Sequence, residues 1–215
     1  IPTGLAHGTI TAVVNHKHFE ITTLRVDVET PGRHADVAFT DNWEEDAARR
    51  DFTMNALFCS PEGESYVPWG GIADLEAGRV RFVGEAMRRI KEDHLRLLRF
   101  FRFHAWYGKG PPDEEGLAAA KVWAKSLAKL SGERIRVEML KLLAASDPVM
   151  VIAEMDETGI LAEAIPGAGG AKILHSLLPL EENADPLRRL AALLRPHGDV
   201  AAVSARLRLS RAEQE

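Results

Sequence analysis

The greatest density of side chains that could do chemistry lies between Arg88 and Trp106. This run contains no glycine or proline, and its apolar residues recur at helical spacing, so it predicts one helix. The charged side of that helix is expected to carry Glu92, Asp93, Arg96 and Arg99, with Phe100 and Phe103 set among them. Because a surface helix does not normally place two phenylalanines among its charges, this row is predicted to line a partly enclosed cleft.

The spacing within this row could read a nucleobase. Glu92 and Arg96 are four residues apart and can pair, which would fix the guanidinium, and Asp93 is expected to lie beside Arg96. Cytosine and adenine each show an amino group next to an unprotonated ring nitrogen, whereas uracil and guanine show the reverse pattern. An aspartate beside an oriented arginine could accept the first pair and reject the second. Taken alone, the spacing favours ordinary salt bridges on a half-buried helix, because such pairs are common.

A second group of polar residues, at Arg50, Asp51 and Asn55, would suit a sugar that carries a polyphosphate. Arginine binds phosphate, and aspartate and asparagine can bind ribose hydroxyls. Arginines at the end of a helix can equally satisfy its dipole. Farther upstream, Glu20 is a carboxylate inside an otherwise uncharged strand. It is interpreted as a solvent-facing residue or as a metal ligand at the lip of a site.

Composition sets limits on the kind of protein. The 215 residues are 46% hydrophobic and 27% charged, as in a soluble globular protein of one or two domains, and no apolar run is long enough to span a membrane. The net charge of -5 argues against indiscriminate nucleic-acid binding, but a basic segment over 79–102 suits a specific polyanion. The single cysteine, Cys59, is expected to be a buried small hydrophobe in a reducing, cytoplasmic compartment.

Strand patterns dominate the first part of the chain and helical periods the second. Hairpins are predicted over 9–14 and 19–24 with a four-residue turn, and over 57–59 and 65–67. Further strands are expected at 36–39 and 79–83, a loop at 26–35, a helix at 43–50 capped by Asp41 or Asn42, and a short helix at Asp74 that this residue could cap.

After Pro112 only helices are predicted: 116–130, 133–145, 148–158, 170–178, 186–194 and 199–207. Ser131 is predicted to lie in the N-cap region of the second of these helices. Arg134, Arg136 and Lys141 on that helix form either a solvated face or an RNA-facing one. A Ser-x-x-Glu pattern at Ser210 has the form of a capping box that starts another helix.

Taken together, several stretches resemble the class II tRNA nucleotidyltransferases (CCA-adding enzymes) and the related bacterial poly(A) polymerases. In the family's order they are 3–9, 19–25, 49–56, 70–75, Glu92–Arg96 with Arg99 and Arg102, and 131–135. The ordered series covers most of residues 1 to about 145 and is far more specific than any one motif. It reverses the interpretation of the Glu92–Arg96 segment in favour of base reading.

The resemblance implies a role for each matching residue. Asp93 and Arg96 would form the amino-acid template that pairs with the incoming base, and Glu92 would hold Arg96. Arg50, Asp51 and Asn55 match the motif for ribose and triphosphate, Arg99 would lie near the triphosphate, and Glu20 matches a carboxylate near the metals. The implied fold is α+β: a partial nucleotidyltransferase β-sheet head over 1–83, a helical neck with the base-reading helix over 84–130, and an all-α, truncated RNA-binding body over 131–215.

The implied activity is addition of CMP and AMP, from CTP and ATP, to the 3′ end of tRNA with Mg²⁺ and without a nucleic-acid template. The family's metal-binding Asp-x-Asp pair lies upstream of the Thr3 motif, so this chain alone is expected to be inactive. Val67 also stands where family members commonly have aspartate. The alternatives are a poly(A) polymerase and a non-catalytic RNA- or nucleotide-binding module.

Overall fold

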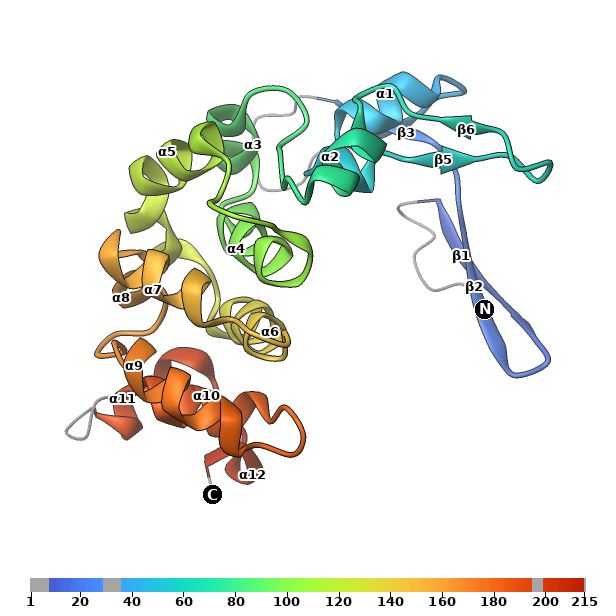
Figure 1. Ribbon diagram of the computed structural model, residues 1–215. Coiled ribbons are helices and arrows are strands. Elements are labelled where there is room, and N and C mark those ends of the chain that lie inside the picture. Colours follow the sequence, from blue (N-terminus) through green and yellow to red (C-terminus); the bar gives the residue numbers. More distant parts are fainter. Residues whose placement is uncertain (1–7, 29–35, 195–198, 215) are drawn as a thin grey trace.

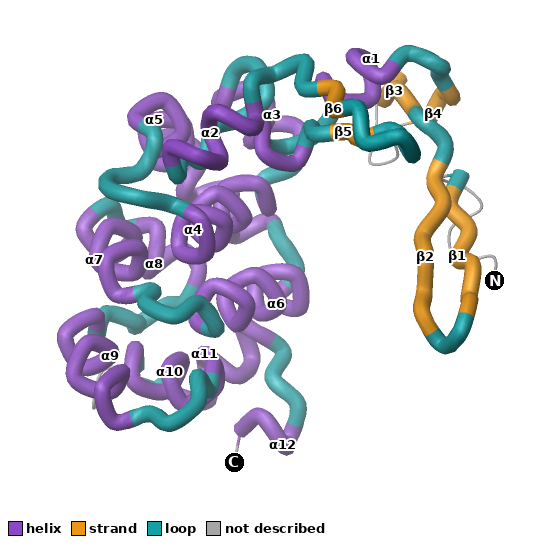
Figure 2. The backbone as a smooth tube through the Cα atoms, turned by 45° about the vertical axis from the view of Figure 1, so that its right-hand side comes forward, coloured by secondary structure: helices purple, strands orange, loops and turns teal. Residues whose placement is uncertain are grey.

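The computed structural model describes residues 8–28, 36–194 and 199–214 (Figure 1). Its helices stack into a curved column, the first elements of the chain cap one end of the column, and a hairpin projects from that cap (Figures 1 and 2). The α+β class predicted from the sequence is confirmed: among the described residues, three two-stranded antiparallel sheets lie within 9–66, and most of the helices follow them. Most of the Thr3 motif and of the loop expected over 26–35 lies outside the described residues.

The projecting hairpin pairs β1 (Thr9–Val14) with β2 (Lys17–Thr22). Its turn consists of Asn15 and His16, both with positive φ, at 50° and 61°. Two left-handed residues match the twist of a two-residue hairpin turn. The predicted four-residue turn was therefore wrong, and β2 begins two residues earlier than expected.

The cap of the column holds the remaining strands and two short helices. β3 (Arg25–Val28) pairs with β4 (Asp36–Phe39), so residues 26–28, which were expected in a loop, belong to a strand. α1 (Trp43–Ala48) is capped by Asn42, one of the two predicted caps. The Asn42 side chain accepts hydrogen bonds from the backbone N–H groups of Glu44 and Glu45. A 3₁₀ turn, η2 (Thr53–Asn55), and the hairpin of β5 (Phe58–Cys59) with β6 (Ser65–Tyr66) follow. Cys59 is exposed, contrary to the expected burial.

α2 (Gly71–Ala77) packs directly on η2. A Cβ on Gly71 would lie 2.1 Å from the carbonyl oxygen of Thr53, so only glycine allows this approach. Asp74 does not cap the helix; it is buried and accepts hydrogen bonds from Thr53 Oγ1 at 2.7 Å and Arg81 Nε at 2.9 Å. The strand expected over 79–83 is reduced to one antiparallel bridge between Phe52 and Phe82, made by backbone hydrogen bonds from Thr53 N–H to the Arg81 carbonyl and from Val83 N–H to the Asp51 carbonyl, both at 3.0 Å.

The long helix predicted over 88–106 is two helices. α3 (Ala86–Glu92) ends at Asp93, which has an extended backbone (φ -144°, ψ 108°), and α4 (Leu95–Tyr107) begins after it. Asp93 Oδ1 accepts from the backbone N–H of Leu95 at 3.1 Å, so this side chain forms an Asx turn that leads into α4. Phe100, expected on the charged side, is buried and stacks on Phe82 at 5.6 Å.

The remaining helices form the column. They are α5 (Glu114–Trp123), η3 (Ala124–Lys129), α6 (Gly132–Leu143), α7 (Val149–Glu157), α8 (Ile160–Ala164), α9 (Ala171–Leu177), η4 (Leu178–Leu180), α10 (Pro186–Leu193), α11 (Val200–Leu207) and α12 (Arg211–Gln214). The helix predicted over 116–130 tightens to 3₁₀ from Ala124, and α8 was not predicted. Glu213 accepts from the backbone N–H of Ser210 at 2.7 Å, as a capping box does.

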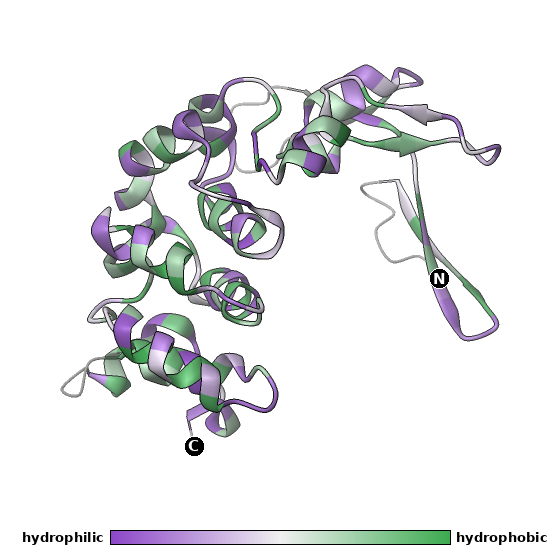
Figure 3. Cartoon of the chain, in the orientation of Figure 1, coloured by the Kyte–Doolittle hydropathy of each residue, from purple (hydrophilic) through white to green (hydrophobic). Residues whose placement is uncertain are grey.

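Apolar and polar residues alternate around the helices of the column (Figure 3). Their apolar sides form one continuous core that extends from Phe52 to Leu207. The division into three domains at residues 83 and 130 stays a prediction, since this core crosses both positions. Within the described ranges, no helix combines the length and apolar character that crossing a bilayer requires.

Candidate functional site

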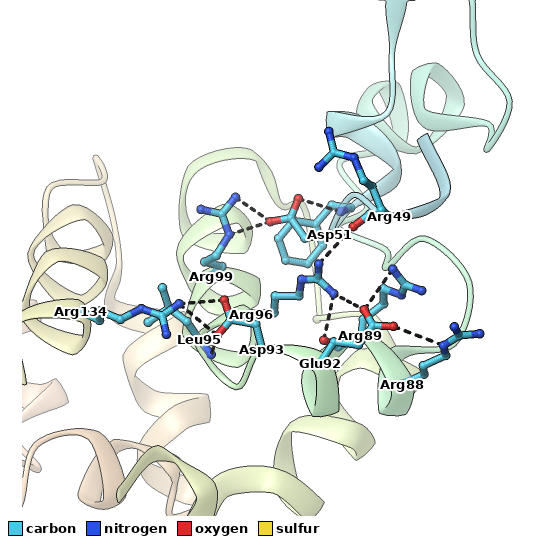
Figure 4. Close-up of polar contacts among 11 residues, drawn as sticks. Arg49, Asp51, Arg88, Arg89, Glu92, Asp93, Leu95, Arg96, Arg99 and Arg134 are labelled. Carbon is cyan, nitrogen blue, oxygen red and sulfur yellow. Dashed lines mark hydrogen bonds and ion pairs between the residues drawn. The ribbon is translucent and has the colours of Figure 1, made fainter. Parts of the chain in front are cut away.

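Most of the predicted site residues meet in one open cleft of about 730 Å³ between the cap of the column, α4 and the start of α6. The residues that line it are Thr22, Arg49, Arg50, Asp51, Asn55, Asp93, Leu95, Arg96, Arg99, Phe103 and Arg134. Figure 4 shows how the side chains from α4, α6 and the segment after α1 converge. Among these lining residues five arginines face two aspartates, so the cleft is electropositive and suited to a polyanion.

Asp51 joins the two sides of this cleft and is only 8% exposed. One carboxylate oxygen accepts from the Asn55 amide at 2.9 Å and from the backbone N–H of Phe52 at 3.0 Å. The other oxygen accepts from Arg99 Nε at 2.6 Å (Figure 4). The predicted residues Asp51, Asn55 and Arg99 therefore form one hydrogen-bonded unit, which ties the segment after α1 to α4.

Two neighbouring arginines are oriented by a residue that the sequence did not single out as a site residue. Asp46, in α1, is 1% exposed and accepts hydrogen bonds from Arg49 at 2.6 and 2.9 Å and from Arg50 at 2.9 and 3.1 Å. Burial alone would raise the pKa of Asp46, but these bonds and one from the backbone N–H of Arg25 outweigh it and hold the pKa below its ordinary value. The spacing of three and four residues to the arginines was the signal available in the sequence.

Arg96 is fixed by three oxygens, in part as the spacing predicts. Glu92 accepts from Nη1 at 2.6 Å, the carbonyl of Arg89 accepts from the same nitrogen at 3.1 Å, and the carbonyl of Arg49 accepts from Nη2 at 3.1 Å (Figure 4). Glu92 also lies 3.1 Å from the Arg89 guanidinium. Glu92 stands behind Arg96 and does not itself line the cleft.

Asp93 forms an ion pair with Arg134 of α6, a partner that the sequence did not predict; it was expected only to lie beside Arg96. Both of its oxygens accept from Arg134 Nη2, at 2.7 and 3.0 Å. The helix break at Asp93 causes this difference, because its extended backbone takes the side chain out of the register of α4. Asp93 and Arg96 nevertheless line the same cleft, and Arg134, expected on a solvated or RNA-facing surface, lines it too.

The other predicted residues lie outside the cleft. Arg136 donates to the carbonyl of Arg208 at 2.6 Å and to Glu213 at 3.0 Å, so it holds the end of the described chain. Lys141 lies at the far end of α6, where its carbonyl accepts from the indole of Trp106 at 2.7 Å. Glu20 is exposed on β2, opposite Thr11. In the part of the chain that the structure describes, no three His, Cys, Asp or Glu residues are grouped as a metal site requires.

Phe103 gives the cleft an aromatic wall, as its place among the charged residues of the helix predicts. Its ring lies 5.4 Å from the Arg99 guanidinium and 4.5 Å from that of Arg102. Arg102 lies 2.8 Å from Glu138 of α6, which is 5% exposed. Burial is the largest influence on Arg102 and lowers the pKa of this guanidinium from its ordinary value, while it remains a cation. The α4–α6 contact is therefore both charged and aromatic.

Two family models match the chain. One is described as the Poly A polymerase head domain and matches residues 1–81; the other is described as a probable RNA and SrmB-binding site of polymerase A and matches residues 112–169. Both descriptions name a polymerase of poly(A), and the second also names RNA.

Individual relatives extend this likeness over the chain. The mitochondrial CCA tRNA nucleotidyltransferase 1 of Danio rerio is 41% identical over 219 residues, which is 98% of this chain and 50% of the relative. The CCA-adding enzyme of Geobacillus stearothermophilus is 38% identical over 173 residues, covering 79% of this chain and 42% of the relative. A crystal structure of the Bacillus stearothermophilus CCA-adding enzyme in complex with CTP matches with a TM-score of 0.83 and 30% identity, over 100% of this chain and 53% of that one. The chain spans about half the length of the curated relatives it matches.

Proposed function

The chain belongs to the family of CCA-adding tRNA nucleotidyltransferases and poly(A) polymerases, and from this premise we propose that it acts in adding CMP and AMP, from CTP and ATP, to the 3′ end of tRNA. The observation that carries the proposal is the convergence of Asp93 and a fixed Arg96 in one cleft with four further arginines. A nucleotide needs both features: a patterned edge for its base and cations for its phosphates.

The base would be read by Arg96 and Asp93. Three oxygens of the protein hold Arg96, which leaves two of its five N–H groups for a ring nitrogen, as far as the described partners go. Asp93 has about four lone-pair positions, of which Arg134 and the backbone N–H of Leu95 take three. The remaining position can accept from an exocyclic amino group. On the Watson–Crick edge, cytosine and adenine offer this amino group beside an acceptor nitrogen, whereas uracil and guanine present a carbonyl oxygen beside a ring N–H.

The sugar and phosphates would lie against the other side of the cleft. Arg50 and Arg99 line it, each already oriented by a carboxylate, so little side-chain freedom is lost when a phosphate binds. Asp51 and Asn55, held together by their hydrogen bond, would bind the ribose hydroxyls. Arginine is well suited to this role because its N–H groups match the geometry of phosphate oxygens.

Mg²⁺ is part of the proposal, but the described residues do not by themselves fit a metal. Glu20 is a lone exposed carboxylate, and a hard divalent cation is usually held by more than one oxygen ligand of protein or substrate. Glu20 would thus supply at most one ligand here.

RNA would bind to the helical part, over 131–215, beyond the head at 1–83 and the neck at 84–130. Of the three residues proposed to face RNA, Arg134 and Arg136 already form ion pairs with carboxylates, so Lys141 is the best placed. A cytoplasmic location also stays a prediction, since the relative from Danio rerio is named as mitochondrial.

The test is calorimetric binding of ATP, CTP, GTP and UTP to the chain and to its Arg96→Ala variant. We expect the unaltered chain to prefer ATP and CTP, and the variant to lose this preference by a factor of about 5 to 150, because one bidentate base contact contributes about 1–3 kcal/mol of discrimination. Arg188→Ala, which removes a half-exposed arginine of α10, is the matched control. An unchanged preference in Arg96→Ala would refute the base-reading role.

The poly(A) polymerase alternative is favoured by the description of the matching head-domain model. The two activities differ in their products. A longer protein containing this chain should build a finite C-C-A end under the proposal, and a long A tail under the alternative.

A further inference from the structure

A second hollow, of about 270 Å³, lies at the C-terminal end of α4. Its lining consists of Arg102, Phe103, Trp106, Tyr107 and Lys141, all of them aromatic or cationic. Trp106 is 50% exposed and Tyr107 is 49% exposed, so two large ring systems that line the hollow are open to solvent. Neither ring serves the proposed nucleotide cleft.

These rings are held in place. The indole N–H of Trp106 donates to the carbonyl of Lys141 on α6 at 2.7 Å, which fixes the plane of the ring. Tyr107 lies against Phe103 with ring centroids 5.8 Å apart. Arg102 lies over the Phe103 ring at 4.5 Å and is held there by its ion pair with Glu138. A ligand that stacks here would therefore have little side-chain motion to suppress.

The hollow continues the nucleotide cleft. Phe103 lines both, and α4 and α6 run alongside each other from the Asp93–Arg134 pair at one end to the Trp106–Lys141 contact at the other. Arg99 and Arg102 lie between these ends on α4. A strand whose end lies in the cleft could thus follow this seam with its phosphates near cations and a base over the exposed rings.

We propose that this hollow binds an unpaired nucleobase of the RNA acceptor strand, stacked on Trp106 and Tyr107, with Lys141 contacting the adjoining phosphate. The proposal rests on the proposed function, which requires an RNA strand next to the nucleotide. Stacking on an aromatic ring suits any base, since every base has a π face, and the cation adds charge complementarity that an apolar peptide would not use. An acidic protein partner would use the cations but would gain little from two open rings.

The test measures binding of a single-stranded oligoribonucleotide that contains 2-aminopurine near its 3′ end, by fluorescence anisotropy and by quenching of that base. Trp106→Ala should weaken RNA binding by a factor of about 5 to 150, equivalent to about 1–3 kcal/mol for one stacked base, and should relieve quenching. Trp106→Phe keeps a ring and should retain most of the affinity. Trp43→Ala removes an equally exposed tryptophan of α1, outside the seam, and should change neither signal.

ATP and CTP binding to the same variants separates this site from the proposed function. The stacking site alone would be overturned if the chain prefers ATP and CTP but its RNA binding does not depend on Trp106. The same conclusion would follow if the unaltered chain prefers ATP and CTP but binds no RNA. RNA binding that depends on Trp106, in a chain with no preference among the four nucleotides, would overturn the base-reading function and leave the stacking site. A blunt-ended RNA duplex with the sequence of a tRNA acceptor stem should compete only weakly with the single-stranded oligoribonucleotide, because the duplex offers no unpaired base.

Discussion

Replacing Asp46 with asparagine tests whether this buried carboxylate positions the arginines of the cleft. Asp46 is 1% exposed and accepts four hydrogen bonds from Arg49 and Arg50, which are 19% and 35% exposed. Removing one partner from a buried ion pair costs about 3–5 kcal/mol. Asparagine keeps one acceptor oxygen and both arginines can turn toward the open cleft, so we expect a loss of about 2–3 kcal/mol in the free energy of unfolding.

This loss corresponds to a decrease in Tm of about 4–12 °C for a chain of this size, measured by circular dichroism. Nucleotide binding should weaken as well, because Arg50 would lose the contact that aims it into the cleft. Glu44→Gln is the matched control: it removes a carboxylate from the same first turn of α1, with the same relation to the helix dipole, but Glu44 is exposed.

The pH dependence of the free energy of unfolding provides a second test of the role of Asp46. The pKa of Asp46 is held below its ordinary value, so its carboxylate stabilises the fold above the unfolded pKa of about 3.9, and this contribution is lost as the pH falls through the folded pKa. The difference between wild type and Asp46→Asn should therefore shrink in acid. Equal stability of the two proteins at pH 7, to within about 0.5 kcal/mol, would refute the reasoning, because surface substitutions alone have effects of that size.

Two further predictions concern α4 and α6. Burial lowers the pKa of His104, whose Nε2 lies 3.1 Å from the carbonyl of Gly110, so the unfolded chain should bind a proton that the folded chain does not. The free energy of unfolding should therefore fall as the pH drops below about 6.5, by up to about 1.4 kcal/mol per pH unit. Urea titrations at several pH values should show this slope, and a flatter one in His104→Gln. Arg134→Ala should leave stability within about 1 kcal/mol, since its pair with Asp93 is largely exposed, but should reduce the preference for ATP and CTP, because Asp93 loses the contact that orients it. Arg136→Ala on the same helix is the control for nucleotide selectivity, and an unaltered preference in Arg134→Ala with weakened RNA binding would favour the RNA-facing interpretation.

Local patterns determined much of the fold and of the candidate site. The 3.6-residue period identified most of the helices of the column, because a helix that packs on a core must keep one apolar side. A cap of α1 at Asp41 or Asn42 followed from residue type and the Glu92–Arg96 pair from spacing, because each links groups less than two turns apart; the structure has the cap at Asn42. The ordered motifs selected the residues that meet in the cleft, and with them the family.

Tertiary packing decided which contacts the residues of the cleft make with one another. Asp93 interrupts the predicted helix and pairs with Arg134, a residue 41 positions away, and no local pattern states that partner. The link from Asp51 to Arg99 spans 48 positions, and the seam of α4 with α6 exists only once both helices join the core. Asp46 and Trp106 acquired their roles in the same way, because burial and long-range hydrogen bonds depend on which surfaces meet in space.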